Sequence, residues 1–380
     1  MMYREQKLFL EDSLMIFVGM DVHVRNSYLI ATDEKGQVLK KSRVSNDRDA
    51  LAGFLDDLGA ESMRVCLEST TNSRPIVCFL EAYGRQAGID LTAQVLDARR
   101  LRIIAESTAK CDRVDAAAIC ELARSNLKLP VCYMPDDEVF ALREHLRSRQ
   151  DLVRVRTMLK NRVHAVLHRR GILPPEQGLF AMEGRMFLKQ MPLDEAGREI
   201  LDRMMRLIAS LDEELMASIR SLRALSQRPR WQVEARRLQT IPGVGLITAM
   251  TILAELGDWR RFKSRAAVAN YSGLVPVVRD SNDKQFRGGI THRGSNHLRS
   301  VLTEAAWVSI RRVPKYQQLY SRVRFKRNAA TAIVAVAREL LEDAFTLLCK
   351  QEDFRYVPTS ADEPMTDTRS DREIAMSVAG

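Results

Sequence analysis

Two apolar segments that each lead into an acidic residue most constrain how the first third of the chain can fold. Residues 16–20 form an apolar run followed at once by Asp21, and residues 63–67, which are apolar except for Arg64, form a second run followed by Glu68. Short apolar runs of this length are typical of strands buried on both faces. A carboxylate at the end of such a strand lies at the rim of the sheet, where open α/β sheets place their sites. The sequence therefore predicts two acidic residues at the edge of a sheet.

The surrounding segments predict a layered α/β or α+β domain over residues 15–135. Apolar patterns bounded by turn residues indicate further strands, and helical spacing of apolar residues indicates helices. Additional strands are expected at residues 27–32, 37–44 and 91–96. One helix is expected directly after the third strand, a second from about residue 74, and a third over residues 112–124. The first helix begins at the capping candidates Ser45 and Asn46.

The order of the strands decides whether the two acids meet. The first three expected strands form a meander, and strand–helix units follow. If the first strand neighbours the fourth, as in ribonuclease-H-like sheets, Asp21 and Glu68 end side by side.

A second pair of acids occurs in the motif KCDRVDA. Asp112 and Asp115 are three residues apart, so they share one face of a helix. Four carboxylates that converge on a small volume repel one another unless cations neutralise them, and Mg²⁺ is the usual hard cation beside phosphates. Two such ions stabilise the attacking and leaving oxygens of phosphoryl transfer. As an alternative, Asp112 and Asp115 are simply the cap and a first-turn acid of the helix.

The rest of the chain is predicted to be helical. Residues 136–228 contain two long stretches with helical spacing, which favours a helical hairpin or coiled coil. Residues 229–352 are expected to form an all-α C-terminal domain. Residues 1–14 are an N-terminal extension, and the polar residues 353–380 are expected to be a disordered tail.

The charge of the chain points to a polyanionic partner. The sequence has 59 Lys and Arg against 49 Asp and Glu, which gives a net charge of +10 and a pI of about 9.4. Nucleic acid is the first candidate partner, although a solvated basic surface has the same composition. No segment reaches the ~18 uninterrupted apolar residues of a membrane span. The six scattered cysteines form no CxxC pair, and the expected location is the cytoplasm.

The segment TIPGVGLITAMTIL has the composition of a helix–hairpin–helix element. Its glycines, Gly243 and Gly245, allow the backbone to approach a phosphate, and the following helix offers its N–H groups. A tight helix–helix turn without a ligand is the alternative. Basic side chains follow in WRRFKSR, and the candidates for phosphate contact there are Arg260, Arg261 and Lys263.

Other basic stretches are further candidates for nucleic-acid contact. The segment FRGGITHRG suits the wrapping of a phosphate, and RVRFKR is a second basic patch. The residues expected to contact nucleic acid are Arg287, Gly288, Gly289 and Arg293 in the first segment, and Arg324, Lys326 and Arg327 in the second. The first long helix also carries basic residues that either follow a nucleic-acid backbone or form a solvated face: Arg143, Arg147, Arg154, Lys160, Arg162, Arg169 and Arg170.

Several motifs resemble those of one known family. The motifs GMDVH, CLEST and KCDRVDA, in this order, resemble the DEDD motif of the insertion-sequence transposases related to the Piv invertases, the "IS one-ten" family. The segments LQTIPGVGLITAMTILAELGDWRRFKSRAAVANYSGLVPVVRDS and RGGITHRGSNHLRSVL resemble the C-terminal transposase domain of that family. The resemblance covers about residues 15–350.

The resemblance implies a mechanism and several partners. Ser281, which alone would be read as a solvated serine in a polar loop, matches the serine that family members use as nucleophile. Family membership implies a RuvC-like catalytic domain, a helical linker used in oligomerisation to a dimer or tetramer, and a helical domain that brings the serine. It also implies DNA partners, namely element ends and target, and a structured guide RNA. The acids that match the DEDD motif are Asp21, Glu68, Asp112 and Asp115.

Three functions remain open at this point. The leading hypothesis is a DNA transposase that cuts and rejoins strands with an acidic tetrad, two Mg²⁺ ions and a serine nucleophile. A RuvC-like nuclease or junction resolvase would use the same acids with water as nucleophile. A nucleic-acid-binding protein with an inactive site is the third reading, against which the four intact acids argue.

Overall fold

The computed structural model of the chain describes residues 15–97, 112–125, 127–175, 178–281, 284–290 and 294–355. Only the backbone is described for residues 112–114, 277–281 and 284–290. The expected N-terminal extension and residues 356–380 of the expected disordered tail lie outside the described residues. The tail was expected to begin at residue 353, which is wrong for Phe354, because its N–H donates to Thr240 Oγ1 at 2.9 Å. The chain divides into two compact units, Met1–Met134 and Pro135–Gly380.

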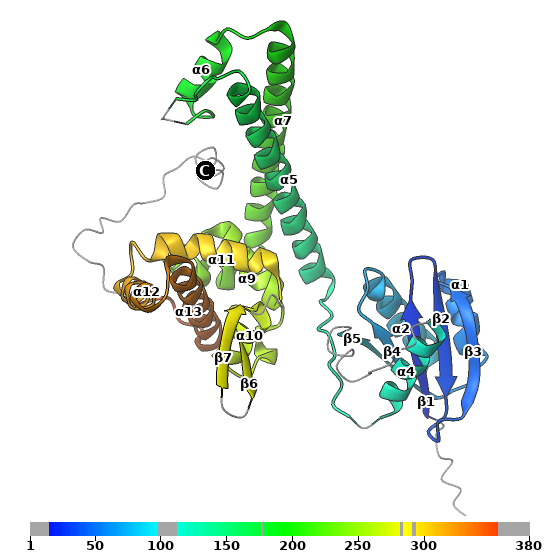
Figure 1. Cartoon of the computed structure of the whole chain (residues 1–380). Helices are drawn as coiled ribbons and strands as arrows, with labels where there is room; N and C mark the ends of the chain where they lie inside the picture. The colour runs from blue at the N-terminus through cyan, green and yellow to red at the C-terminus, as the bar shows by residue number, and fades with distance from the viewer. Residues whose placement is uncertain are drawn as a thin grey trace, which may run out of the picture. The chain divides into compact units, whose positions relative to one another are not determined.

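The first unit contains a five-stranded sheet with the strand order β3-β2-β1-β4-β5 (Figure 1). Its strands are β1 (Met15–Val22), β2 (Asn26–Thr32), β3 (Val38–Ser45), β4 (Ser62–Glu68) and β5 (Asp90–Leu96). β2 pairs antiparallel with β1 and β3, whereas β4 pairs parallel with β1 and β5. The expected strands and the expected neighbourhood of the first and fourth strands are therefore confirmed, as in a ribonuclease-H-like sheet.

Helices cover both faces of this sheet. They are α1 (Arg48–Asp56), α2 (Ser73–Ala87) and α4 (Asp112–Arg124). Val18 and its even-numbered neighbours in β1 pack with α1 and α2, whereas Phe17 on the opposite face packs with α4. Burial on both sides explains why the central strands read as continuous apolar runs rather than alternating ones.

The start of α1 differs from the sequence expectation. Asp47 caps this helix, because its Oδ1 accepts a hydrogen bond from Ala50 N at 2.8 Å. Asn46 lies outside the helix, and its Nδ2 donates to His23 O at 2.7 Å. The capping candidates Ser45 and Asn46 are therefore wrong, since a tertiary contact engages the Asn46 amide and the helix begins later.

Gly19 in β1 determines how closely α4 approaches the sheet. A Cβ atom on Gly19 would lie 2.3 Å from Ala116 O and 2.4 Å from Cys120 N, and both are backbone atoms of α4. We expect Gly19→Ala to lower the free energy of unfolding by about 1–3 kcal/mol, because α4 must move away from the sheet. Denaturant unfolding of the purified protein measures this loss.

Gly53 in α1 provides the matched control for Gly19. Nothing lies within 4 Å of a Cβ atom built on Gly53. Alanine is also the better helix former, so Gly53→Ala should leave stability unchanged or raise it by up to about 1 kcal/mol. Equal stability of the two variants would contradict the tight β1–α4 contact.

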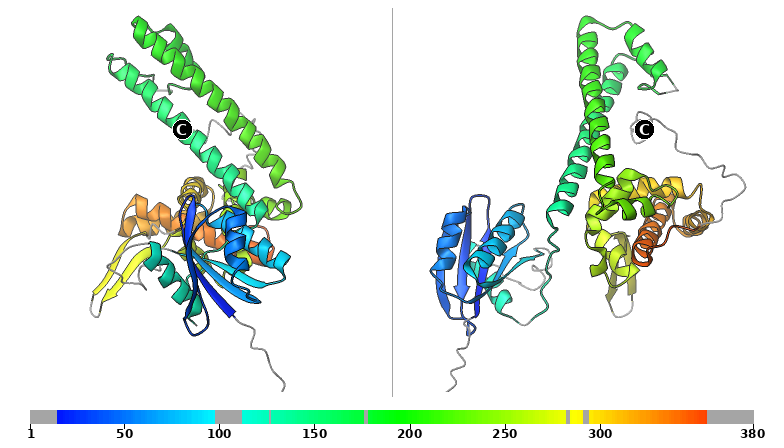
Figure 2. Two further views of the ribbon diagram at one scale, coloured as in Figure 1. Left: turned by 90° about the vertical axis from the view of Figure 1, so that its right-hand side faces the viewer. Right: turned by 180° about the vertical axis from the view of Figure 1, so that it is seen from behind.

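The second unit begins with a long helical hairpin (Figures 1 and 2). Its helices are α5 (Asp137–His168), the short α6 (Met182–Gln190) and α7 (Glu195–Ser226). Arg156 near the middle of α5 bonds Asp212 at 2.9 Å, and Arg170 just after α5 bonds Asp194 just before α7 at 3.0 Å. The later position along α5 pairs with the earlier position along α7, so the two helices are antiparallel and the predicted antiparallel hairpin is confirmed. The sequence did not predict α6.

The C-terminal part adds a cluster of helices and one two-stranded sheet. Its elements are α8 (Gln232–Leu238), α9 (Leu246–Leu256), η1 (Trp259–Arg261), α10 (Arg265–Ser272), β6 (Pro276–Ser281), β7 (Lys284–Ile290), α11 (Asn296–Ser309), α12 (Pro314–Lys326) and α13 (Ala329–Lys350). Leu146 of α5 and Leu222 of α7 belong to the same buried core as Leu253 of α9 and Leu340 of α13. The base of the helical hairpin is therefore part of the C-terminal core.

The β6–β7 hairpin is a correction to the all-α expectation for residues 229–352. The two strands pair antiparallel, with Val278 opposite Arg287 and Asp280 opposite Gln285. Polar and glycine residues dominate this segment, so its sequence resembles a loop. Pairing between the two strands, rather than an apolar pattern within either one, gives it a regular structure.

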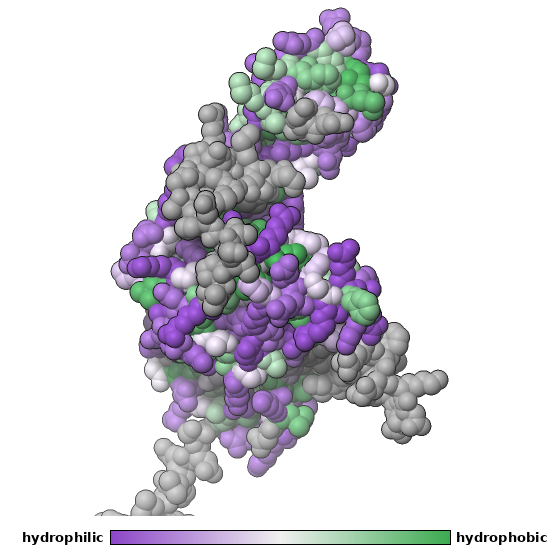
Figure 3. Space-filling model, turned by 90° about the vertical axis from the view of Figure 1, so that its left-hand side faces the viewer, coloured by the Kyte–Doolittle hydropathy of each residue, from purple (hydrophilic) through white to green (hydrophobic). Residues whose placement is uncertain are grey.

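The surface of the second unit is mainly hydrophilic on the face shown in Figure 3. Hydrophobic side chains gather at the end of the helical hairpin that is remote from the C-terminal helices. Leu173 is 82% exposed and Met182 is 80% exposed in this region. Exposed apolar side chains in a group are typical of an interaction surface. Across the described ranges, no helix has both the length and the apolar character that crossing a membrane would require.

Candidate functional site

Asp21 and Glu68 occupy neighbouring positions at the carboxyl edge of the five-stranded sheet. β1 and β4 are parallel, with Met20 opposite Leu67. One further step along each strand brings Asp21 opposite Glu68. The expected side-by-side position of the two acids is therefore confirmed, whereas their chemical role stays a prediction.

The strand β1 extends slightly further than its sequence indicates. It ends at Val22, and Asp21 still pairs with Tyr28 of β2. Asp21 is consequently held by strands on both sides, and it is 8% exposed. A carboxylate in this position is fixed by the sheet and not by a flexible turn.

Both acids lie on the sheet face that α4 covers. Successive side chains of a strand point to opposite faces of the sheet, so residues an even number of positions apart share a face. Phe17 lies four positions before Asp21 in β1, and Cys66 lies two positions before Glu68 in β4. Phe17 and Cys66 both pack with α4. Burial raises the pKa of the Cys66 thiol to about 12, so this thiol stays neutral under the acid pair. The apolar core thus reaches up to the acids on this face.

α4 runs antiparallel to β1, so its first turn lies toward the same edge as the acid pair. Ala116 lies beside Gly19, and further along the helix Cys120 Sγ donates to Phe17 O at 3.2 Å, earlier in the strand. Asp112 is one helical turn before Ala116, about 6 Å along the axis. The acid of β1 is two residues beyond Gly19, about 6.6 Å along the strand. The backbone therefore directs the start of α4 toward the acid pair.

Two asparagines fix the turn that follows Asp21, and the sequence analysis missed their role. Asn72, in the loop after β4, donates through Nδ2 to Val24 O at 2.9 Å and to His23 O at 3.2 Å. Asn46, after β3, donates to His23 O at 2.7 Å. The His23 ring lies beside the Asp21 carboxylate, with Nε2 3.3 Å from Asp21 Oδ2. The signal in the sequence is an asparagine between a strand and the next helix, but asparagines are common in such turns, so the sequence does not distinguish these two.

The acid edge has the donor type that hard divalent cations bind. Asp21 and Glu68 present carboxylate oxygens from adjacent strands, and Asp112 and Asp115 belong to the first turn of α4. Among the side chains that the structure describes, no three His, Cys, Asp or Glu residues are gathered closely enough to hold a metal ion. The residues fit a magnesium site by their chemistry. The complete four-acid cluster stays a prediction beyond the Asp21–Glu68 pair.

Ser281 occupies the tip of the β6–β7 hairpin and not an irregular loop. It is the last residue of β6 and pairs with Lys284, the first residue of β7. The acid pair belongs to the first unit and Ser281 to the second. The expectation that the serine reaches the acids from another domain or subunit therefore stays a prediction.

The base of the β6–β7 hairpin is held together tightly. Gly294 has a φ of 92°, and a Cβ atom there would lie 2.3 Å from Tyr271 O. Arg299, which is 8% exposed, donates through Nη1 to Ser272 O at 3.1 Å and to Gly294 O at 3.3 Å. One buried guanidinium thus joins the chain before the hairpin to the chain after it.

The predicted helix–hairpin–helix segment lies between α8 and α9, and its two glycines differ. Gly243 has a φ of 96°, and a Cβ atom there would lie 2.5 Å from Ser309 Oγ and 2.6 Å from Ala305 O of α11. This packing requires a glycine without any ligand. Gly245 is the N-cap of α9, with open space around a Cβ atom. Contact of Gly245 with a phosphate stays a prediction.

The basic residues after α9 divide into two kinds. Arg261 donates through Nε to Leu256 O at 3.4 Å, and its guanidinium carbon lies 4.1 Å from the Phe262 ring centroid. It therefore fixes the local fold. Arg260 and Lys263 are exposed, with Arg260 lying 3.7 Å from Asp258, and their contact with a nucleic-acid backbone stays a prediction.

The other predicted basic residues lie on α12 and β7. Arg324, Lys326 and Arg327 are exposed at the end of α12. Arg287, Gly288 and Gly289 belong to β7, and Arg293 lies outside the described residues. Nucleic-acid contact by either set stays a prediction.

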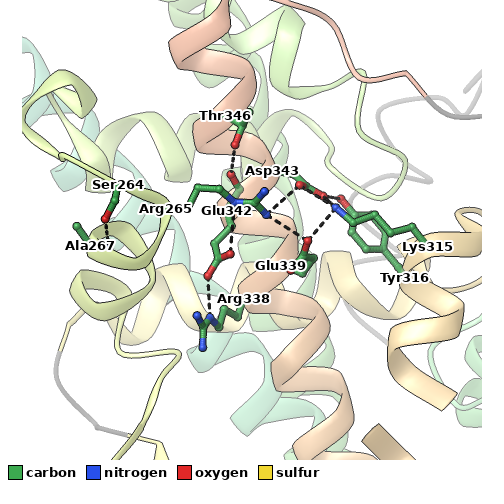
Figure 4. A network of polar contacts seen from close by, with 10 residues as sticks. All are labelled: Ser264, Arg265, Ala267, Lys315, Tyr316, Arg338, Glu339, Glu342, Asp343 and Thr346. Carbon is green, nitrogen blue, oxygen red and sulfur yellow. Dashed lines mark hydrogen bonds and ion pairs between the residues drawn. The ribbon is translucent and has the colours of Figure 1, made fainter. Parts of the chain in front are cut away.

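A network of charged groups fixes α10 against α12 and α13 (Figure 4). Asp343 of α13 is 8% exposed, and it accepts hydrogen bonds from Lys315 Nζ at 2.6 Å and from Tyr316 Oη at 2.8 Å. Arg265, the first residue of α10, donates to Asp343 at 3.3 Å and to Glu339 at 3.1 Å. Because α10 leads into β6, this network also helps to fix the base of the hairpin.

Removing the Asp343 charge should destabilise the second unit. We expect Asp343→Asn to lower the free energy of unfolding by about 2–3 kcal/mol, because two cations and a buried hydroxyl lose their common partner. Burial and the Asp343 carboxylate raise the pKa of Tyr316, so its hydroxyl remains the donor. Thermal or urea unfolding measures the loss, and Glu352→Gln on the surface is the control. An unchanged stability would contradict a structural role of the network.

The same network should make stability depend on acid pH. Burial alone would raise the pKa of Glu339, but the hydrogen bond with Lys315 holds this pKa below 4.5. The stabilisation is therefore present above that pH and is lost as the pH falls through the pKa of the folded state.

Two family models match the chain, one in each half. A model described as "Transposase", and named for a DEDD transposase of the IS110 type, matches residues 18–171. A model described as "Transposase IS116/IS110/IS902 family" matches residues 235–321. The first match contains all four predicted acids, and the second contains Ser281.

Curated relatives match along most of the chain. A transposase for insertion sequence element IS1111A from Coxiella burnetii is 26% identical over 350 residues, which cover 89% of this chain and 91% of the relative. A probable family 20 transposase from Pseudomonas aeruginosa is 30% identical over 264 residues, covering 65% of this chain and 74% of the relative. A transposase for IS1328 from Yersinia enterocolitica is 29% identical over 305 residues, covering 79% and 85%.

Proposed function

The chain belongs to the IS116/IS110/IS902 family of transposases, and from this premise we propose how its residues cut and rejoin DNA. The proposed reaction moves an insertion sequence between two DNA sites. It uses an acid site at the edge of β1 and β4 and a serine at the tip of the β6–β7 hairpin. The observation that supports the proposal is the parallel register of β1 and β4, in which Met20 faces Leu67 and the two acids come one residue later, with α4 running toward the same edge.

The proposed role of the four acids is to hold the scissile phosphate through divalent cations. Two Mg²⁺ ions bound there would neutralise the charge that develops on the attacking and leaving oxygens. Asp21 and Glu68 supply ligands from the rigid sheet, and Asp112 and Asp115 supply them from the start of α4. The sheet and the α4 contact at Gly19 keep these ligands in place before substrate binds.

The proposed nucleophile is Ser281. Its Oγ attacks the scissile phosphorus, so that a serine–phosphate bond forms while one P–O bond of the DNA backbone breaks. The serine proton passes to the DNA oxygen that leaves. Attack by the hydroxyl of another DNA strand reverses these changes and rejoins the DNA without an external energy source.

The proposed partners are element-end DNA, target DNA, a structured guide RNA and further copies of this chain. The net charge of +10 and the exposed basic residues of α12 support polyanion binding. The exposed apolar side chains at the remote end of the helical hairpin support assembly into a dimer or tetramer.

The experiment that tests this function is recombination by the purified protein. A plasmid with both element ends, a target, Mg²⁺ and the transcript of the adjacent non-coding DNA are mixed, and joined products are amplified and sequenced. Joined products that require the protein and its acids support the proposal, whereas cleavage without any joining would support a nuclease.

A further inference from the structure

A polar cavity of about 530 Å³ lies beside the base of the β6–β7 hairpin in the second unit. Tyr271, whose carbonyl contacts Gly294 at that base, is part of the lining. Basic and polar lining residues come from α5 and from the start of α11, and they are Arg143, Arg147, Arg154, Ser295, Asn296 and His297. Segments that are far apart in the sequence thus form one polar cavity that is open to solvent.

The three arginines lie on one face of α5. Their positions differ by four and eleven residues, so they are stacked along the helix. Arg143 is held in place, because its Nε donates to Ala254 O at 2.8 Å. Arg147 and Arg154 have side chains that are 52% and 65% exposed, and their carboxylate neighbours are on α5 itself. Exposed pairs of this kind contribute little to stability, so both guanidinium groups can turn toward a phosphate.

The start of α11 adds a second attraction for an anion. Ser295 caps this 14-residue helix by accepting a hydrogen bond from Leu298 N at 3.2 Å. The first N–H groups of a helix have no acceptor within the helix, and its dipole favours negative charge at this end. Asn296 and His297, the first two residues of α11, face the cavity.

His297 supplies an observation that is independent of charge. Its Nδ1 is buried and has no hydrogen-bond partner in the part of the chain that the structure describes. Burial lowers the pKa of His297, so its ring is neutral and can donate or accept a hydrogen bond. A buried ring nitrogen without a protein partner is free to bond a water molecule or a bound ligand in the cavity.

The cavity also contains two acids, and these indicate which anion fits. Asp151 bonds Arg154 at 3.1 Å, and Glu255 is 5% exposed. Arg149, which is 4% exposed, adds positive charge close to His297. A small inorganic anion would meet these carboxylates, whereas a nucleotide combines a phosphate for the guanidinium groups with base amino groups that donate to a carboxylate.

We propose that this cavity binds one nucleotide of a nucleic-acid strand, with its phosphate between Arg147, Arg154 and the start of α11. The bound nucleotide holds the strand beside the base of the hairpin whose tip carries Ser281. This inference rests on the proposed function for the identity of that strand as substrate or guide. The contact itself requires no catalysis.

The test compares two arginine substitutions in the cavity with a matched control. The double variant Arg147→Gln and Arg154→Gln is titrated against fluorescent single-stranded DNA or RNA of about 20 nucleotides, in EDTA. We expect about tenfold weaker binding, and a slope of log affinity against log salt that is smaller by about 0.7, since the two arginines neutralise one phosphate and each neutralised phosphate contributes about 0.7 on a single strand.

The control is Arg203→Gln on α7. Arg203 is 61% exposed and pairs with Glu199 one turn away, which closely matches the 65% exposure of Arg154 and its pairing with Asp151. Arg203 does not line the cavity. The control should bind both probes as the wild type does. Equal affinities and equal salt slopes for the cavity variant and the control would overturn the proposal.

The DNA and RNA probes distinguish the source of the strand. A loss confined to DNA assigns the cavity to substrate, and a loss confined to RNA assigns it to a guide; either supports the site. Because binding is measured without a divalent ion, the result is independent of catalysis. If acid variants keep recombining while the cavity variant loses binding, the proposed function fails and the nucleotide site stands.

Discussion

Glu68→Gln is expected to abolish strand cutting and joining while the protein stays folded. Glu68 ends β4 beside Asp21 of β1, and the amide would remove one of the charges that we propose hold the cations. The loss of several kcal/mol of transition-state stabilisation corresponds to a rate lower by about a thousandfold or more. Recombined product from the plasmid assay measures the effect, and circular dichroism together with denaturant unfolding checks the fold. Stability should be unchanged or slightly higher, because neighbouring carboxylates repel one another.

Asp90→Asn is the matched control for Glu68→Gln. Asp90 is an exposed acid at the opposite end of the same sheet, where β5 begins. It should recombine as the wild type does. Wild-type activity in Glu68→Gln would contradict the acid site at this edge.

The acids of α4 can be separated by the same assay. Asp115→Asn should lose recombination as Glu68→Gln does. If Asp112 only caps α4, Asp112→Ala should instead lower stability by about 0.5–2 kcal/mol and keep activity.

Ser281→Ala is expected to abolish both the covalent protein–DNA intermediate and the recombined product. The variant should still bind element-end DNA, because no phosphate contact is removed. Wild-type protein with labelled element-end DNA, Mg²⁺ and the guide transcript should give a band that survives denaturant, since the serine–phosphate bond is covalent. The variant should give no such band.

Ser321→Ala is the control for the serine, because Ser321 is exposed on α12 in the same unit. It should form the covalent band and the product normally. Cleavage that persists in Ser281→Ala would make water the nucleophile and favour the nuclease alternative. A persisting covalent band would assign the attack to another residue, and Ser295 would be tested next. Ser272 is a weaker candidate because it is buried, with its hydroxyl bonded to Ala269 O at 2.7 Å.

The apolar pattern of the sequence was sufficient to predict the strands of the first unit, because each strand is indicated by consecutive residues of one segment. The apolar runs before Asp21 and Glu68 showed two buried strands, and parallel neighbours bring their carboxyl ends to one edge. The helical hairpin was predictable for the same reason, since apolar residues recur at helical spacing along α7 and toward both ends of α5.

The structure of polar and glycine-rich segments was predicted less accurately, because it depends on contacts with residues elsewhere in the chain. The strands β6 and β7 contain mostly polar and glycine residues, and their order comes from pairing with each other. Asn46 looked like a helix cap, but its amide holds a carbonyl in the turn after Asp21. Gly243 looked like a phosphate-binding glycine, whereas its close contact with α11 already requires the absence of a side chain.

The sequence by itself determined the strands, the long helices, the acids at the ends of β1 and β4, and the membership of a transposase family. Tertiary structure alone decided that α4 approaches β1 at Gly19 and that Arg147, Tyr271 and His297 surround one cavity. Secondary structure follows from the periodicity of neighbouring residues, which a single segment contains. A cavity or a close helix–sheet contact depends on which distant surfaces pack together, and no segment contains that information alone.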